Sequence, residues 1–118
     1  MPDFFISYSR VDRKFAERFR NLLLRQTPGS SVFLDSVSLY GGQDWWDEIL
    51  DNIEKCDIFF YLLSNDSVQS RYCRTEFEFA QQLGKPIITV MIRDRTNVPD
   101  EIAAIQRVDM TPDTDEAE

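Results

Sequence analysis

Short apolar runs alternate with segments of helical period along almost the whole chain, and this alternation restricts the possible folds more than any other feature of the sequence. The apolar runs are too brief for helices and are rich in aromatic and β-branched side chains, which is typical of strands buried on both faces. The expected strands are 4–8, 31–35, 57–64, 86–92 and 107–110.

The segments between these strands carry apolar residues on one helical face and charged residues on the other. Ser9 or Asp12 is expected to cap the first helix, and Pro99 is expected to occupy the first turn of the last one. A polar connection, 65–70, precedes the third helix. The expected helices are 11–27, 45–56, 71–83 and 99–106.

Strands and helices in regular alternation, with short connections, predict a parallel sheet that helices cover on both faces. The fold class expected for 118 residues is one α/β domain, a flavodoxin-like three-layer sandwich with five strands in the order 2-1-3-4-5. We assign residues 1–112 to this domain. Residues 113–118 carry four of the net eight negative charges and are expected to form an acidic tail or the start of a linker.

The composition excludes several classes of function. The chain has no histidine, so catalysis by a Ser-His-Asp or Cys-His arrangement is impossible, as is a metal site built on imidazole. Its two cysteines, Cys56 and Cys73, cannot form a four-thiolate zinc site, and no metal is expected. The net charge of −8 argues against nucleic-acid binding by this domain. With no export signal and no stretch near the roughly 20 apolar residues of a membrane span, a cytoplasmic protein without membrane contact is expected.

Positive charge is concentrated in one segment, although the chain as a whole is acidic. Residues 10–25 hold six lysines and arginines against two carboxylates, a local charge of +4. An exposed helix face is the favoured interpretation, and a docking surface for an acidic partner is the alternative.

In an open parallel sheet, ligands bind beyond the carboxyl ends of the strands, where the strand order reverses. For the order 2-1-3-4-5 that point lies between the first and third strands, which are followed by residues 9–11 and 64–66. The loop after the second strand, with Gly41-Gly42, and the start of the third helix are expected close by. Polar side chains in these segments are therefore the first candidates for a site.

Glu76 interrupts the apolar face of the third helix. It lies three residues after Cys73 and four before Ala80, inside the apolar stripe, whereas Glu78 projects away from it. A carboxylate on a packing face beside the expected crevice indicates a functional role. Periodicity alone leaves two other interpretations open, a place at the edge of the stripe or an ion pair with an arginine such as Arg10.

Other polar and aromatic features support simpler interpretations. The acidic residues of the second helix form its outer, solvated face rather than a metal site. Gly41-Gly42 lacks the lysine and the spacing of a P-loop and the pattern of a dinucleotide-binding turn. Trp45 and Trp46 are adjacent on a helix, so only one of them is expected in the core and the other can stack on a ligand or a partner.

Five segments, in the correct order, resemble the signature boxes of TIR (Toll/interleukin receptor) domains. Tyr72 and Phe77 replace a usual tryptophan and leucine, and the last box of the family is not recognisable near 107–112. The five segments are DFFISYS at 3–9, VFLD at 32–35 with the following loop to 44, the W-x-x-x-I of 45–49, SRYCRTEF at 70–77 and KPIITVMI at 85–92.

The resemblance implies the NAD-cleaving type of TIR domain found in bacteria and plants, because Glu76 matches the glutamate of the family's W-C-x-x-E segment. The implied function is that of an NAD+ nucleosidase, with or without ADP-ribosyl cyclase activity, which self-assembly activates in immune, antiviral or cell-death signalling. NAD+ is then the substrate, and no cofactor is expected. The implied partners are further TIR domains and a fused or associated sensor module. The alternative is a non-catalytic module for TIR–TIR interaction.

The same resemblance implies roles for further residues. Glu76 is the catalytic residue, and one loop, the BB loop, completes the active site across neighbouring subunits. The implied substrate-binding residues are Tyr8, Ser9, Arg10, Trp45 and Ser64, and the implied assembly residues of the BB loop are Ser38, Leu39, Tyr40, Gly41 and Gly42.

Overall fold

The computed structural model describes residues 2–34, 43–93, 96–105 and 107–111, of which 43–45 are described as backbone only. Its sheet is parallel throughout, with the strand order β2-β1-β3-β4-β5. This confirms the predicted fold class and strand order. The strands are β1 (Asp3–Ser7), β2 (Ser31–Leu34), β3 (Ile58–Leu63), β4 (Ile87–Met91) and β5 (Arg107–Asp109).

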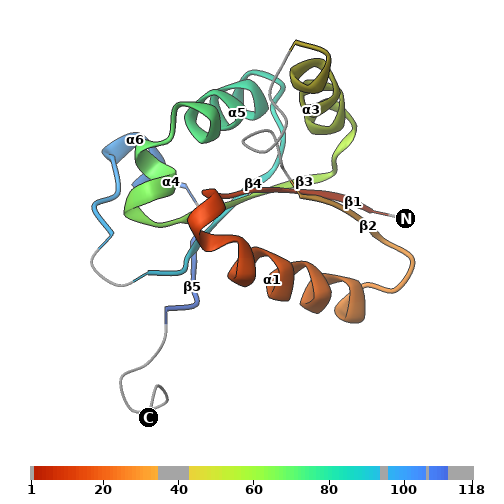
Figure 1. The fold of residues 1–118 in the computed structure, drawn as a ribbon, viewed down its shortest axis with the longest axis horizontal. Helices are drawn as coiled ribbons and strands as arrows, with labels where there is room; N and C mark the ends of the chain where they lie inside the picture. Colours follow the sequence, from red (N-terminus) through yellow and green to blue (C-terminus); the bar gives the residue numbers. More distant parts are fainter. Residues whose placement is uncertain (1, 35–42, 94–95, 106, 112–118) are drawn as a thin grey trace.

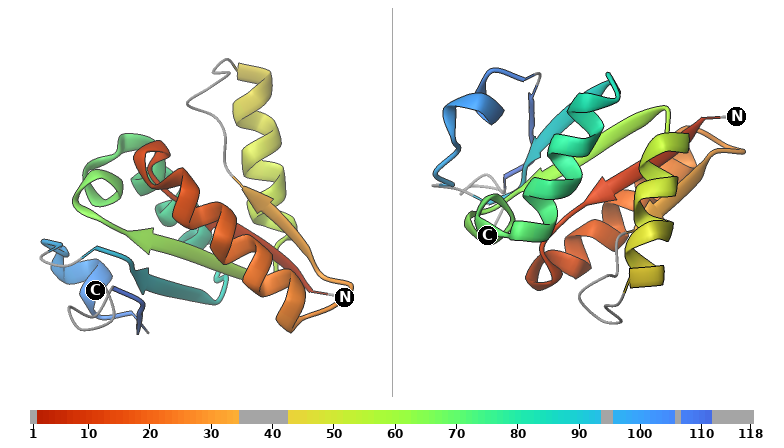
Figure 2. Two further views of the ribbon diagram at one scale, coloured as in Figure 1. Left: turned by 60° about the horizontal axis from the view of Figure 1, so that its bottom comes forward. Right: turned by 90° about the horizontal axis from the view of Figure 1, so that it is seen from above.

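Helices lie on both faces of this sheet (Figure 1), with α1 on one face and α3 and α5 on the other. Figure 2 shows, from above, α3 and α5 running over the sheet side by side. The helical elements are η1 (Arg10–Asp12), α1 (Arg13–Gln26), α3 (Gln43–Lys55), α4 (Asn65–Gln69), α5 (Arg71–Gln82) and α6 (Asp100–Ala103). Among the described residues, no helix is long and apolar enough to cross a membrane.

The central strand β1 divides its side chains between the two layers. Phe5 belongs to the core beneath α3 and α5, where its ring stacks on Phe33 and Phe59 at 5.2 and 5.3 Å between centroids. Phe4 and Ile6 belong to the core beneath α1. Because side chains alternate along a strand, Ser7 faces the same layer as Phe5, below α5.

Edge-to-face contacts between aromatic rings hold the α1 layer together. Phe60 of β3 meets Phe19 of α1 and Phe4 of β1 edge to face, with centroids 5.1 and 5.7 Å apart. Tyr8 is buried in the same cluster. Burying each of these large side chains contributes roughly 1.5–3 kcal/mol, so this layer fixes α1 firmly against the sheet.

Three local predictions were wrong. Residues 65–70 were expected to form a connection, but they contain the short helix α4, which Ser64 and Ser67 cap reciprocally. Pro99 is the N-cap of α6 rather than a first-turn residue, and the helix ends at Ala103. Ser9 and Asp12 do precede η1 and α1, but neither side chain makes a capping hydrogen bond.

Candidate active site

Helix α5 carries Glu76 over the middle of the sheet. Its N-cap is Ser70, whose hydroxyl accepts a hydrogen bond from the backbone N–H of Cys73. Its buried face contains Cys73, Phe77 and Ala80. Glu76 lies on the same face with 0% of its surface exposed, so the carboxylate belongs to the packing face and not to its edge.

The end of the central strand supplies a hydrogen-bond donor to this carboxylate. The hydroxyl of Ser7 donates to Oε1 of Glu76 at 2.7 Å, and both side chains are buried. Ser7 is the last residue of β1 and pairs with Tyr61 of β3. The carboxylate therefore lies between β1 and β3 at their carboxyl ends, which is the point where the strand order reverses.

Tyr61 is a second buried polar group beside this site. Burial raises its pKa well above the ordinary value, and the nearby Cys73 and Glu76 act in the same direction, whereas Arg74 opposes them. The phenol donates its proton to the backbone oxygen of Ser67 at 2.9 Å. Tyr61 is thus held as a neutral donor to the backbone of α4, with its ring 5.4 Å from that of Phe77.

A buried carboxylate is costly unless polar groups compensate it, and its interactions with a charge are stronger than in water. Glu76 can accordingly stabilise a cation that forms beside it. Because none of its surface is exposed, a substrate can reach it only after a neighbouring segment moves.

Asp12 forms a second buried network at the same edge of the sheet. Its carboxylate is only 2% exposed, and it accepts a hydrogen bond from Ser64 Oγ at 2.6 Å. Arg93 approaches its other oxygen with Nε at 3.0 Å and Nη2 at 2.9 Å. This network joins the chain segments that follow β1, β3 and β4. The sequence had marked Asp12 only as a candidate helix cap.

Two of the other expected substrate-binding residues, Tyr8 and Ser64, make their described contacts away from Glu76. Tyr8 is buried in the α1 layer, on the opposite face of the sheet. The hydroxyl of Ser64 is bound to Asp12 and to the first turn of α4, so its visible role is structural. Ser9 is half-buried before η1, and Arg10 is exposed.

The loop expected to mediate assembly, residues 38–42, lies outside the described residues, as does the side chain of Trp45. The neighbouring Trp46 packs against the core and meets Tyr72 edge to face at 6.0 Å. One of the two tryptophans therefore joins the core, as predicted. Within the described part of the chain, no cluster of three or more acidic or thiol side chains could hold a metal ion.

A family model described as the TIR domain matches residues 4–118. The chain belongs to the TIR domain family. A search of curated proteins finds no match to this TIR domain. The acidic segment 113–118 falls inside the matched range and outside the described residues, so its role as a tail or linker stays a prediction.

Solved structures show the same fold. The TIR domain of the Toll-related receptor TRR-2 from Hydra magnipapillata is 21% identical, with a TM-score of 0.75, 93% of this chain covered and 85% of that one. The CMP N-glycosidase BcmB from Clostridium botulinum is 20% identical, with a TM-score of 0.67 and coverages of 91% and 88%. The TIR domains of the activated Roq1 resistosome are 20% identical, with a TM-score of 0.60 and coverages of 76% and 57%. At these identities the likeness establishes the shared fold alone.

Proposed function

We propose that this TIR domain is an NAD+ nucleosidase in which Glu76 is the catalytic carboxylate. The observation that carries the proposal is the position of Glu76, which is buried at the strand-order reversal and receives a hydrogen bond from Ser7. The same residue matches the glutamate of the NAD-cleaving members of the family, so the sequence resemblance and the buried position of Glu76 both support this assignment.

The reaction suits a chain that has no histidine. The C–N bond between ribose and nicotinamide breaks, and its electron pair neutralises the cationic ring nitrogen, so the leaving group needs no proton. The ribosyl carbon develops oxocarbenium character, as in glycoside hydrolysis. A fixed carboxylate beside it stabilises that charge and orients the ribose hydroxyls. Water then bonds to the ribosyl carbon and releases a proton, giving ADP-ribose; attack from within the molecule gives a cyclic product.

One structural relative supports the proposed type of reaction. BcmB is by name a CMP N-glycosidase, an enzyme that acts on an N-glycosidic bond of a nucleotide on the same fold. In this proposal the exposed Arg10 contacts the diphosphate of NAD+ and the aromatic ring of Trp45 stacks on a base. Ser9 also contacts the nucleotide part of the substrate. Ser64 and Tyr8 hold the segments around the site in place.

The complete burial of Glu76 supports activation by assembly, because the site has to open before a substrate can enter. The partners in this proposal are further copies of the domain, joined through the loop 38–42, and a fused or associated sensor module. The Roq1 relative is described as an activated resistosome. We place the activity in immune or cell-death signalling on this basis. A cytoplasmic location stays a prediction.

The test is NAD+ consumption at high protein concentration, with and without a crowding agent, followed by identification of the products. The variant is Glu76→Gln, which keeps an acceptor for the Ser7 hydroxyl and removes the charge. We expect its turnover to fall about 100-fold or more, the loss typical of removing an electrostatic stabiliser. The matched control is Glu78→Gln, an exposed change two residues away on the same helix, which should leave turnover unchanged. Equal turnover in both variants would overturn the proposal.

A non-catalytic interaction module is the second candidate, and one observation favours it. Glu76 is sealed from solvent and hydrogen-bonded to Ser7, which is also how a purely structural carboxylate is accommodated. This candidate predicts concentration-dependent assemblies that consume no NAD+ under any of the conditions above. In that case Glu76→Gln would change the free energy of unfolding alone.

A further inference from the structure

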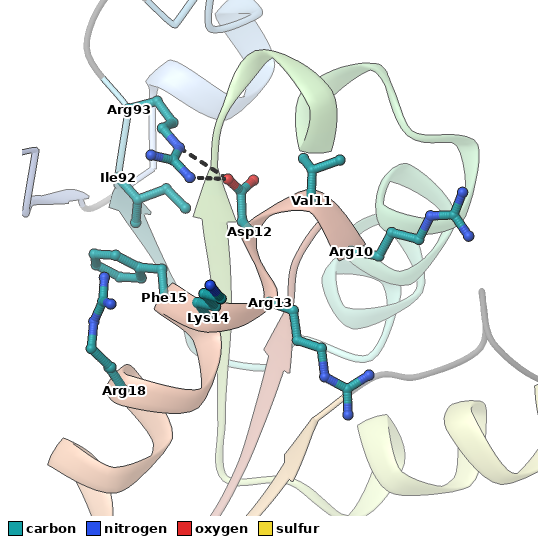
Figure 3. A pocket seen from close by; sticks show the side chains of 9 residues that line it. All are labelled: Arg10, Val11, Asp12, Arg13, Lys14, Phe15, Arg18, Ile92 and Arg93. Carbon is teal, nitrogen blue, oxygen red and sulfur yellow. Dashed lines mark hydrogen bonds and ion pairs between the residues drawn. The ribbon is translucent and has the colours of Figure 1, made fainter.

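A cleft of about 620 Å³ opens beside the start of α1, against the end of β4, as Figure 3 shows. Its lining is strongly basic in a chain whose net charge is −8. Of the described residues of the lining, Ile92, Val11 and Phe15 supply apolar surface, and Asp12 is the one carboxylate. The five cationic residues of the lining are Arg10, Arg13, Lys14, Arg18 and Arg93.

Within the described part of the chain, three of these cations have no carboxylate partner. Arg93 is bound to Asp12, and Arg13 pairs with Glu17 at 3.1 Å on the exposed surface of α1. Among the residues that the structure describes, no carboxylate pairs with Lys14, Arg10 or Arg18. Cations that line a hollow with low-dielectric walls raise the local concentration of anions.

One wall of the cleft is held rigidly. Asp12 accepts hydrogen bonds from both Arg93 and Ser64, so the guanidinium of Arg93 is fixed beside η1. The guanidinium of Arg18 lies over the ring of Phe15, 5.7 Å from its centroid. In Figure 3 these basic and aromatic groups lie on one side of Asp12, while Arg10 lies on the other. The cationic side chains of the lining are thus spread over both sides of Asp12.

This cleft lies apart from Glu76 and its hydrogen-bond donor, although it shares Arg10 with the proposed substrate contacts. Its residues come from η1, from the first turns of α1 and from the end of β4, and Glu76 is not part of its lining. Glu76 belongs to α5, and its donor Ser7 lies beneath that helix, whereas α1 covers the opposite face of the sheet. Only Arg10 has been assigned to the substrate in the proposed reaction.

We propose that this cleft binds a nucleotide that carries two or three phosphates, at a site distinct from the catalytic one. Arginine and lysine side chains match phosphate oxygens in charge and geometry. The volume is within the range of about 300–1,000 Å³ that accommodates small organic ligands, and it exceeds the size of a single phosphate ion. The exposed Val11 and the partly buried Phe15 offer apolar surface to a base. A hollow with both polar and apolar walls favours such a ligand over an extended acidic protein segment.

The first experiment titrates the purified protein with ADP by calorimetry, with adenosine and pyrophosphate as comparisons. We expect saturable binding of ADP that weakens as salt is added, weaker binding of pyrophosphate, and none of adenosine. Lys14→Glu should weaken ADP binding about tenfold or more, because it replaces a phosphate-facing cation by an anion. The matched control is Arg25→Glu, the same change of charge in the last turn of α1 and outside the cleft, which should leave binding unaltered.

Four results would overturn the proposal. They are the absence of saturable ADP binding, equal binding of adenosine, equal loss in the two charge reversals, and tighter binding of an acidic peptide such as hexaglutamate than of ADP. A final measurement asks whether ADP binding depends on the proposed catalytic carboxylate. Glu76→Gln should retain ADP binding whether or not NAD+ is cleaved, and loss of binding in that variant would place the nucleotide at Glu76 instead.

Discussion

Asp12 shows what a single buried charge contributes to this domain. It connects residues 52 and 81 positions further along the chain, through Ser64 and Arg93. Removing it in Asp12→Ala leaves the buried hydroxyl of Ser64 without that acceptor and releases Arg93. We expect a loss of about 2–3 kcal/mol in the free energy of unfolding, measured by urea denaturation. The exposed Glu78→Ala should change stability by less than about 0.5 kcal/mol. A similar small effect for both would show that the network is dispensable.

The thiol of Cys56 permits a chemical test of the core. Burial raises its pKa to about 11, the nearby Asp57 and Asp3 add to this, and Lys85 partly opposes it. The thiolate is the reactive form, so at pH 8 only about one thiol in a thousand is ionised. We expect iodoacetamide to modify Cys56 slowly in the native protein and rapidly after unfolding, as followed by mass spectrometry. Rapid native modification at neutral pH would contradict this burial.

These residues differ in how far the sequence alone could identify them. Glu76 stands out because its neighbours at helical spacing are apolar, which is a local signal. Asp12 and Arg93 gave no such signal, because their contact depends on how separate strands end at one edge of the sheet. Local periodicity carries no information about such long-range pairs, so Asp12 was expected only as a helix cap.

At the scale of single elements, the end of α5 depends on backbone conformation. Gly84 follows this helix with φ of +70°, in the left-handed region, and its backbone N–H reaches the oxygen of Gln81. A Cβ at this position would meet nothing within 4 Å. The loss of stability in Gly84→Ala therefore comes from the strained backbone conformation and not from a clash with neighbouring atoms. We expect a loss of about 1–2 kcal/mol by thermal or urea unfolding, and a smaller loss for Gly84→Asn, which tolerates this region better. Equal stability of the alanine variant would rule out this strain.

The elements that the sequence did not reveal share a physical cause. Helix α4 is five residues long and has no apolar period, and its capping pair is Ser64 with Ser67 rather than the serine-to-glutamate pattern that marks a helix start. Its stability comes from contacts outside the helix, such as the phenol of Tyr61 bound to Ser67. Long amphipathic helices and apolar strands, in contrast, carry their own signal and were predicted at the correct places.

At the scale of the whole molecule, the strand order was predictable because short connections and right-handed crossovers leave few arrangements. The cleft beside α1 was not predictable. Its lining combines residues 10–18 with residues 92 and 93, and its shape depends on the side-chain conformations of both groups. The excess of positive charge in residues 10–25 was visible in the sequence, but the hollow that gathers part of it was not.

Charge is distributed unequally between the two helical layers of the domain, and this difference affects self-association. Helix α1 is basic and lies on one side of the sheet, while exposed acidic residues of α3, among them Glu48 and Glu54, lie on the other side (Figure 1). Faces of opposite charge on opposite sides favour head-to-tail contacts, which extend into open assemblies when the rotation does not close. If the domain assembles as proposed, this attraction contributes to the encounter between copies.

Salt should therefore weaken the assembly. Raising the ionic strength from about 0.1 M to about 1 M shortens the screening length from about 10 Å to about 3 Å. We expect the weight-average mass at a fixed high protein concentration to fall over this range, as measured by sedimentation. Glu48→Lys should lower the mass already at low salt, because it places a cation on the acidic face, whereas Glu17→Lys, the same change of charge on the basic helix α1, should not lower it. A mass that stays constant or rises with salt would mean that apolar contacts drive the association instead.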